Sequence, residues 1–130
     1  MIVIDASAAV QASLTAEGFA LLAAEDLIAP RLLWSEAPSA LHELFWRRTI
    51  SAQLARQALD RFLAAPIVGK RPARLTTEAW RIADDLGWAK TYDAEYVALA
   101  RLTRCRLLTV DARLRRGAAR IVEIVTPADL

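Results

Sequence analysis

Short apolar runs rich in Val, Ile and Leu recur along this chain, and longer helical patterns separate them. Each run is too short for a helix and is typical of a buried strand. The runs occupy residues 2–4, 27–30, 66–69, 107–110 and 121–125. Strands that alternate with helices are joined by crossover connections, which favour a parallel sheet with helices on both faces. The sequence therefore predicts an α/β fold with three layers, α/β/α, around a central parallel sheet.

Helical patterns fill the segments between these runs. They are expected after Asp5, over residues 17–24, 35–49, 51–64, 76–86 and 92–103, and in a short stretch after Asp111. In residues 35–49 the apolar positions fall on one side, and Pro38 is tolerated because the first turn leaves its N–H groups unpaired. Ser51 is a suitable N-cap for the next helix, and Gly87 is suited to end a later one.

Length and composition limit the class of protein. At 130 residues the chain has the usual size of one domain and shows no linker or repeat, so we expect a single domain over residues 1–130. No apolar run approaches the ~20 residues needed to cross a bilayer, and the N-terminus lacks the pattern of a signal peptide. One cysteine, Cys105, and one histidine, His42, argue against a disulfide and against zinc held by nitrogen and sulfur. We expect a cytoplasmic protein.

Positive charge is concentrated in the second half of the chain. Residues 66–130 carry twelve Lys or Arg against eight Asp or Glu, whereas residues 1–65 carry five against seven. Nearly all the basic residues are Arg, which binds phosphate with paired hydrogen bonds, although a solvated surface agrees with this composition equally well. The candidates for contacting phosphates are Lys70, Arg71, Arg74, Arg113, Arg115 and Arg116. No aromatic residue is interleaved with them, so the sequence does not indicate base stacking.

Four acidic residues follow the predicted strands or begin the predicted helices. Asp5 and Asp111 come directly after buried strands, while Glu36 and Asp93 lie in the first turns of two helices. Ligands bind beyond the carboxyl ends of parallel strands, so the four carboxylates are expected to share one cavity there. Crowded carboxylates repel each other unless cations lie between them, and hard ions such as Mg²⁺ or Mn²⁺ prefer oxygen ligands. The pattern therefore indicates a divalent metal site.

Each of these acids also has an ordinary structural explanation. Asp5 and Asp111 could cap the helices that follow them, and Glu36 and Asp93 could stabilise helix N-termini through the helix dipole. The sequence pattern alone leaves both explanations open.

Four segments carry the acids in a recognisable order. They are residues 4–7 (IDAS), 29–36 (APRLLWSE), 91–100 (TYDAEYVALA) and 108–114 (LTVDARL). Together they resemble the motifs of the PIN-domain family, most of all the VapC-type toxin ribonucleases of toxin–antitoxin pairs, and residues 91–100 are the most specific match. One departure follows Glu36, where the family often has Val and then Asn. Here Ala37, Pro38 and Ser39 stand instead, and Ser39 can still donate a hydrogen bond.

The resemblance implies a PIN-like fold and an endoribonuclease that uses Mg²⁺ or Mn²⁺ to hydrolyse phosphodiester bonds in RNA. It implies that Asp5, Glu36 and Asp93 are the principal catalytic metal ligands. Asp111 would act through a second ion or through a bound water. A metal ion in such a site lowers the pKa of a water, orients it and stabilises the charge of the transition state.

Hydroxyl side chains lie close in sequence to two of these acids. Ser7 and Thr109 are candidates for donating hydrogen bonds that hold the carboxylates in place, although a helix cap and a strand residue would also explain them. This mechanism needs no histidine, so we expect His42 to be a surface or packing residue.

Large aromatic residues are numerous for a chain of this length. They are Trp34, Phe45, Trp46, Trp80 and Trp88. We expect most of them in the core, but Phe45 and Trp46 are neighbours on one helix and cannot both face inward. We therefore expect an apolar surface that forms a homodimer and, as the resemblance implies, a groove for a peptide of a cognate antitoxin.

Two other functions of the same fold stay open. A catalytically silent RNA-binding or protein-interaction module would normally have lost one of the acids, and all four are present here. A structure-specific DNase is also compatible, because no residue pattern in this chain reads the 2′-hydroxyl of RNA.

Overall fold

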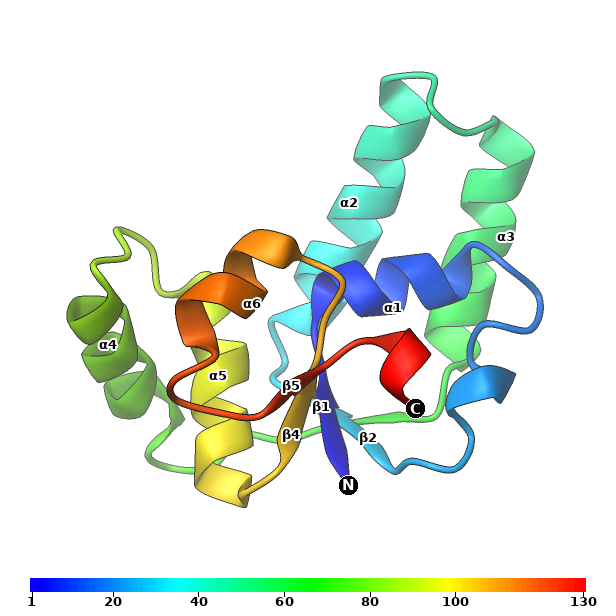
Figure 1. The fold of residues 1–130 in the computed structure, drawn as a ribbon. Helices are drawn as coiled ribbons and strands as arrows, with labels where there is room; N and C mark the ends of the chain where they lie inside the picture. The colour runs from blue at the N-terminus through cyan, green and yellow to red at the C-terminus, as the bar shows by residue number, and fades with distance from the viewer.

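A computed structural model describes all 130 residues and contains a five-stranded parallel sheet (Figure 1). The strands are β1 (Ile2–Ile4), β2 (Leu27–Ala29), β3 (Ile67–Gly69), β4 (Arg106–Leu108) and β5 (Ile124–Val125). Their order across the sheet is β3-β2-β1-β4-β5. The chain runs outward from β1 to β3 and then crosses back to β4 and β5. The direction of winding therefore reverses between β1 and β4, the place where open α/β sheets bind ligands.

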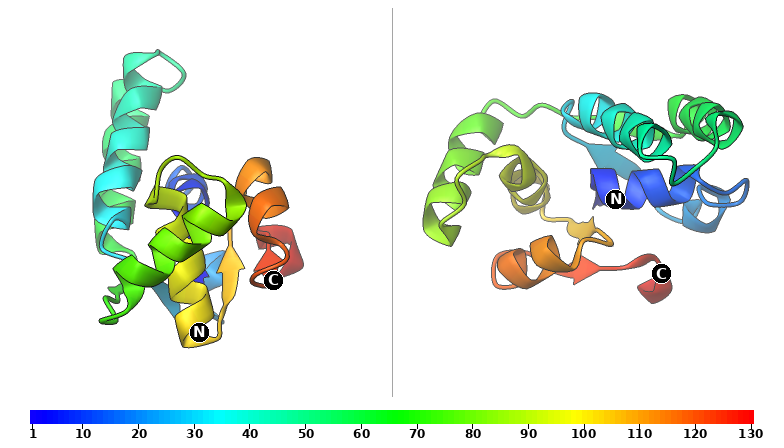
Figure 2. Two further views of the ribbon diagram at one scale, coloured as in Figure 1. Left: turned by 90° about the vertical axis from the view of Figure 1, so that its left-hand side faces the viewer. Right: turned by 90° about the horizontal axis from the view of Figure 1, so that it is seen from above.

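Helices cover both faces of the sheet (Figure 2). They are α1 (Ala6–Ser13), α2 (Leu33–Trp46), α3 (Ala52–Ala64), α4 (Leu75–Leu86), α5 (Tyr92–Thr103) and α6 (Ala112–Ala118), with two 3-10 turns at Ala20–Leu22 and Pro127–Asp129. The helices α1, α2 and α3 lie on one face, and α4, α5 and α6 lie on the other, as right-handed crossovers require for this strand order. The predicted three-layer fold is confirmed. No helix combines the length and the apolar character needed to cross a membrane.

The core is one cluster of 28 buried residues built around β1, whose three side chains are completely buried. A central strand covered on both faces reads as a continuous apolar run, which explains why the sequence shows no alternation there. Phe62 of α3 packs on one side of the sheet, and Val97 of α5 packs on the other. The edge of the sheet that carries the acids is thus held by packing on both faces.

Two helical predictions need correction. Residues 17–24 form only the 3-10 turn Ala20–Leu22. Gly18 approaches the end of α1 so closely that a Cβ there would lie 1.9 Å from the carbonyl oxygen of Ala12, which explains the irregular path. The helix predicted over residues 35–49 spans Leu33–Trp46, so Pro38 lies beyond the first turn and leaves one helical hydrogen bond unmade. The predicted caps are confirmed, since Ser51 accepts from the N–H of Leu54 at 3.0 Å and Gly87 has φ 69°.

Every strand after β1 is shorter than predicted: β2 and β3 each lack one end residue of the predicted run, and β4 and β5 have specific reasons. The strand β4 ends at Leu108. The N–H of Thr109 still bonds to the carbonyl of Val125 at 3.1 Å, but the two N–H groups after it bond to side chains: Val110 donates to Oγ of Ser7 at 3.1 Å, and Asp111 donates to Oγ1 of Thr109 at 3.0 Å. The strand β5 begins only at Ile124, because residues 121 and 122 donate their N–H groups to the carbonyl of Ala118 and so form a turn after α6.

The prediction that most of the large aromatics are core residues needs correction, because none of the five is fully buried and two are exposed. The side chains of Trp46 and Trp80 are 76% and 69% exposed. Trp34 and Trp88 are partly buried against the core, and Phe45 is partly buried on α2. His42 is exposed and meets the ring of Phe45 edge-on, with centroids 5.7 Å apart, so it is a surface residue.

Candidate active site

The pairing of β1 with β4 sets the centre of the site. Ile4 pairs with Leu108, so the next residues, Asp5 and Thr109, lie side by side where the two strands end. Thr109 donates its hydroxyl hydrogen to Oδ2 of Asp5 at 2.5 Å. Ser7 donates to Oδ1 of Asp5 at 2.7 Å, and the N–H of Ala8 donates to the same oxygen at 2.9 Å. Asp5 is therefore held by three donors at the carboxyl end of the central strand.

Each of the two hydroxyls in this network also accepts a backbone hydrogen bond. Ser7 accepts from the N–H of Val110, and Thr109 accepts from the N–H of Asp111. Both hydroxyls thus link the turn after β4 to the carboxylate after β1. Ser7 and Thr109 therefore do two things with the same hydroxyls. They hold the carboxylate of Asp5, as predicted, and they stabilise the β4–α6 turn.

Asp5 is buried, with only 4% of its surface exposed. Burial, together with the weaker effect of the nearby charge of Asp111, raises the pKa of its carboxyl from the ordinary 3.8 to about 6, although the three hydrogen bonds act to lower it. A buried carboxylate with no cation beside it destabilises the folded protein when it is ionised. Its surroundings fit a role in which a cation comes to it.

Asp111 both caps a helix and faces the site. Its Oδ1 accepts from the N–H groups of Arg113 and Leu114 at 2.9 and 3.3 Å, so it is the N-cap of α6. Its charge also raises the pKa values of Asp5 and Asp93. Asp111 is therefore confirmed as a helix cap, and its charge also acts on the neighbouring acids.

Glu36 enters the site from the first turn of α2, on the opposite side from α6. Its Oε1 accepts a hydrogen bond of 2.6 Å from the hydroxyl of Tyr96, a fully buried residue of α5. Burial raises the pKa of Glu36, the charge of Asp93 raises it further, and the bond from Tyr96 lowers it. Tyr96 was missed by the sequence analysis, although it lies three residues after Asp93 and so on the same side of that helix.

Two acids of α5 complete the group. Burial and the charge of Asp111 raise the pKa of Asp93, while Arg113 lowers it. Burial and the charge of Glu36 raise the pKa of Glu95, while Arg71 lowers it. Glu95 was not among the predicted site residues. It lies two residues after Asp93, and residues two apart do not share a helix face, so helical periodicity did not indicate it. These effects connect the four predicted acids in series, Asp5 with Asp111, Asp111 with Asp93 and Asp93 with Glu36.

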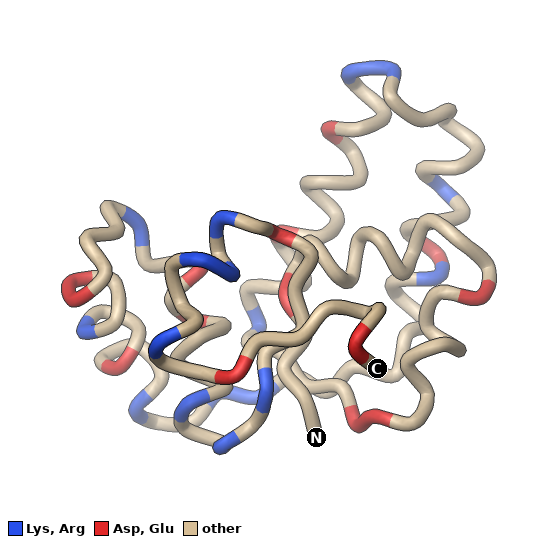
Figure 3. Tube along the Cα trace, in the orientation of Figure 1, with Lys and Arg blue, Asp and Glu red and all other residues tan.

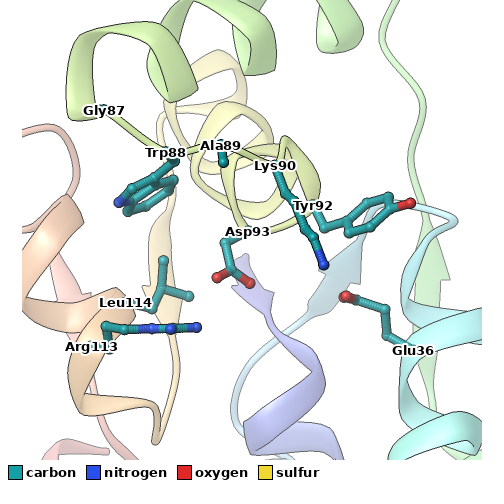
Figure 4. A pocket seen from close by; sticks show the side chains of 9 residues that line it. All are labelled: Glu36, Gly87, Trp88, Ala89, Lys90, Tyr92, Asp93, Arg113 and Leu114. Carbon is teal, nitrogen blue, oxygen red and sulfur yellow. The ribbon is translucent and has the colours of Figure 1, made fainter.

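A cavity of about 530 Å³ opens beside these acids (Figure 4). It is lined by Glu36, Gly87, Trp88, Ala89, Lys90, Tyr92, Asp93, Arg113 and Leu114. Figure 4 shows the carboxylate of Asp93 in the middle, with Glu36 and Lys90 on one side and Arg113 on the other. The cavity thus brings two carboxylates and two cations together, whereas Asp5 is buried and does not line it.

The four carboxylates do not form a tight cage. No three acidic, histidine or cysteine side chains come close enough to hold one ion directly. An ion at this edge of the sheet would therefore take part of its coordination from water.

The predicted phosphate contacts fall in different places. Arg113 lines the cavity, and Arg71 lies near Glu95. Arg115 lies near Asp129 at the end of the chain, and Figure 3 shows the basic positions of α6 spread along the helix. Lys70, Arg74 and Arg116, which were also predicted to contact phosphates, are exposed and do not line the cavity.

Ser39, the residue at the departure from the family pattern, lines a different hollow between α2 and α3 and makes no side-chain hydrogen bond. The donor that holds Glu36 is Tyr96 instead.

Comparison with known proteins identifies the family. The family model described as PIN domain matches residues 2–120. The chain belongs to the PIN-domain family. Among relatives, it is 39% identical over 115 residues to "VapC ribonuclease Mb0985" of Mycobacterium bovis and equally to "Ribonuclease VapC9" of Mycobacterium tuberculosis, with 88% of each chain covered. The resemblance seen in the four motifs is thus confirmed, and this PIN domain falls among the VapC-type members.

Solved structures share the fold of this PIN domain. The structure of PAE2754 from Pyrobaculum aerophilum matches with a TM-score of 0.72 at 23% identity and covers 98% of this chain and 91% of that one. VapBC2 from Rickettsia felis, solved with a DNA fragment from its promoter, matches with a TM-score of 0.67 at 15% identity, covering 97% and 98%. These identities are low, so the two likenesses show the fold alone.

Proposed function

We propose that this PIN domain is an endoribonuclease that hydrolyses RNA phosphodiester bonds with the help of a divalent metal ion, as the toxin of a toxin–antitoxin pair. The observation that carries the proposal is the gathering of Asp5, Glu36, Asp93 and Asp111 around one edge of the sheet, where β1 and β4 end. The ribonuclease names of relatives at 39% identity over most of the chain support it.

The donor set fits Mg²⁺ or Mn²⁺ as the ion. The candidate ligands are carboxylates only, and burial together with mutual repulsion raises the pKa values of Asp5, Glu36 and Asp93, which a nearby cation would reverse. Mg²⁺ keeps several waters and needs only one or two protein carboxylates, in agreement with the spread of these acids. Asp5, Glu36 and Asp93 would hold the ion, directly or through bound water, and Asp111 would act through water or a second ion. When bound, the ion supplies an activated water and stabilises the charge of the transition state.

The remaining residues of the site position these ligands and the substrate. Ser7 and Thr109 fix Asp5, and Tyr96 fixes Glu36, so the carboxylates have defined directions before substrate arrives. Arg113 and Lys90 extend into the cavity from opposite sides, where they would contact phosphates of the RNA on either side of the cut. The other basic residues proposed to contact the RNA backbone are Lys70, Arg71, Arg115 and Arg116.

Cleavage of an end-labelled, unstructured single-stranded RNA tests this function. We expect cutting with Mg²⁺ or Mn²⁺, none in EDTA, and recovery when excess ion is added back. Cleavage that persists in EDTA would contradict a metal-dependent mechanism. Cleavage of the matching DNA strand at the same rate would favour the DNase, and metal-independent RNA binding without cleavage would favour the silent module.

The proposed toxin also needs a surface for its antitoxin. A hollow of about 590 Å³ lies between α2 and α3, lined in part by Leu41, Phe45 and Leu59, and the neighbouring Trp46 is 76% exposed. We propose that this α2–α3 hairpin, which projects from the body in Figure 1, binds the antitoxin peptide and that exposed apolar residues support a homodimer in the cytoplasm. A mass that stays monomeric in light scattering over a range of concentrations would exclude the dimer.

A further inference from the structure

The cavity beside the acids has an aromatic wall that the proposed chemistry does not use. Trp88 lies in the short loop between α4 and α5, and its side chain lines the cavity next to Leu114 of α6 (Figure 4). Metal binding and phosphate contacts need acidic and basic groups, and an indole ring provides neither. The place of Trp88 in this cavity therefore needs a different explanation.

The indole of Trp88 packs closely against α6. Gly117 leaves the space that the ring occupies, since a Cβ at this position would lie 2.8 Å from Cζ2 of Trp88. The side chain is partly buried and packs against the core, while Leu114 beside it is buried. A ring that is fixed before a ligand arrives loses little conformational entropy on binding, so Trp88 is suited to be a stacking platform.

Cationic groups share this cavity with the apolar wall. Arg113 extends beneath Leu114 toward Asp93, and Lys90 enters from the other side (Figure 4). The cavity measures about 530 Å³, within the range of about 300–1,000 Å³ found for small-molecule sites. An apolar platform next to cations and to metal-binding carboxylates matches the chemistry of one nucleotide, which has a flat base and an anionic phosphate.

We propose that Trp88 stacks on the unpaired base of a nucleotide next to the scissile phosphate, while Arg113 contacts that nucleotide's phosphate. The proposal rests on the ribonuclease function above and adds to its active site a subsite for one base, which must be unpaired to reach the platform. The sequence alone does not indicate this subsite, because Trp88 is far from Arg113 in sequence and shares a cavity with it only in the folded protein.

The test compares RNA binding and cleavage by Trp88→Ala, Trp88→Phe and Trp80→Ala. Trp80 is a matched control, because it is an exposed tryptophan on α4 that does not line the cavity. Binding is measured in an Asp5→Asn background, which prevents cleavage, with a short unstructured RNA and with the same RNA lacking one base next to the cleavage site. Thermal unfolding checks that each variant is folded.

Loss of one stacked base is expected to weaken binding of the intact RNA by Trp88→Ala about 5- to 150-fold. Trp88→Phe should recover most of the affinity, and Trp80→Ala should bind normally. Trp88→Ala should no longer distinguish the intact RNA from the abasic one. The proposal is overturned if Trp88→Ala binds and cuts as the parent does, or if it weakens binding of both RNAs equally.

These measurements test the base-binding subsite and the nuclease activity separately. If the parent protein cuts RNA but Trp88→Ala cuts it equally well, the base-binding proposal fails and the nuclease stands. If no cleavage is seen but binding depends on Trp88 and on the base, the subsite stands and the nuclease fails. If the parent protein binds no RNA, both proposals fail.

Discussion

The substitution Glu36→Gln is expected to slow metal-dependent cleavage of single-stranded RNA by at least about 100-fold, because it removes a ligand charge on which several kcal/mol of transition-state stabilisation depend. The change keeps the size of the side chain. The amide oxygen of Gln can still accept the 2.6 Å hydrogen bond from Tyr96, so the packing of α2 against α5 should survive. The measurement is the single-turnover rate of cleavage at saturating Mg²⁺.

The same helix offers a matched control for this change. Glu43 lies on α2 but is exposed and pairs with Arg47 at 2.6 Å, outside the cavity. Glu43→Gln removes the same charge, and an exposed ion pair contributes only about 0–1 kcal/mol to stability. Its cleavage rate should therefore equal that of the parent protein. A Glu36→Gln variant that cuts at the parent rate would remove Glu36 from the proposed ligands.

The substitution Asp5→Asn is expected to abolish cleavage and to make the metal-free protein more stable at neutral pH. The raised pKa of Asp5, about 6 instead of 3.8, corresponds to up to about 3 kcal/mol of folding free energy lost when this buried carboxyl ionises. Asn does not ionise. It is also a good N-cap residue, so it can keep the hydrogen bond from Ala8 that begins α1. Urea unfolding in EDTA at pH 7 measures the gain.

The raised pKa of Asp5 also sets how the stability difference between the two proteins changes with pH. Between pH 3.8 and about 6 the folded protein keeps a proton on Asp5 that the unfolded chain releases, so the contribution of Asp5 to stability falls as the pH rises through this window. The advantage of Asp5→Asn should be largest at pH 7 and should vanish near pH 4. Asp60→Asn, an exposed change on α3, should show no such trend. An Asp5→Asn protein less stable than the parent at pH 7 would show that the lost hydrogen bonds outweigh the relieved burial.

The sequence was sufficient to predict the sheet edge and its acids. Buried strands of a parallel sheet are apolar throughout, so the aspartate that ends such a run is visible in the sequence. Asp5 and Asp111 were recognised in this way, and the structure places them at the ends of β1 and β4 or in the turn that follows. The helical positions of Glu36 and Asp93 followed from first-turn placement, and the order of the motifs indicated the family.

Contacts between distant segments were beyond the reach of the sequence. The bond from Tyr96 to Glu36 joins α5 to α2, and the position of Trp88 over Gly117 depends on how the α4–α5 loop packs on α6. Side-chain acceptors also ended β4 earlier than its apolar run suggested, because Ser7 and Thr109 bind the N–H groups of the turn. Each of these features arises from tertiary packing, and periodicity along the chain does not encode it.

The most direct test of the proposed metal site is a calorimetric titration of Mn²⁺ into the RNA-free protein, its Asp93→Asn variant and an Asp84→Asn control. Asp93 lines the cavity, whereas Asp84 is exposed on α4 and lies outside it. We expect saturable binding by the parent protein and by Asp84→Asn, and binding at least about 10-fold weaker by Asp93→Asn. Equal Mn²⁺ affinity in the parent and in Asp93→Asn, or no binding by the parent, would contradict a metal site formed by these carboxylates.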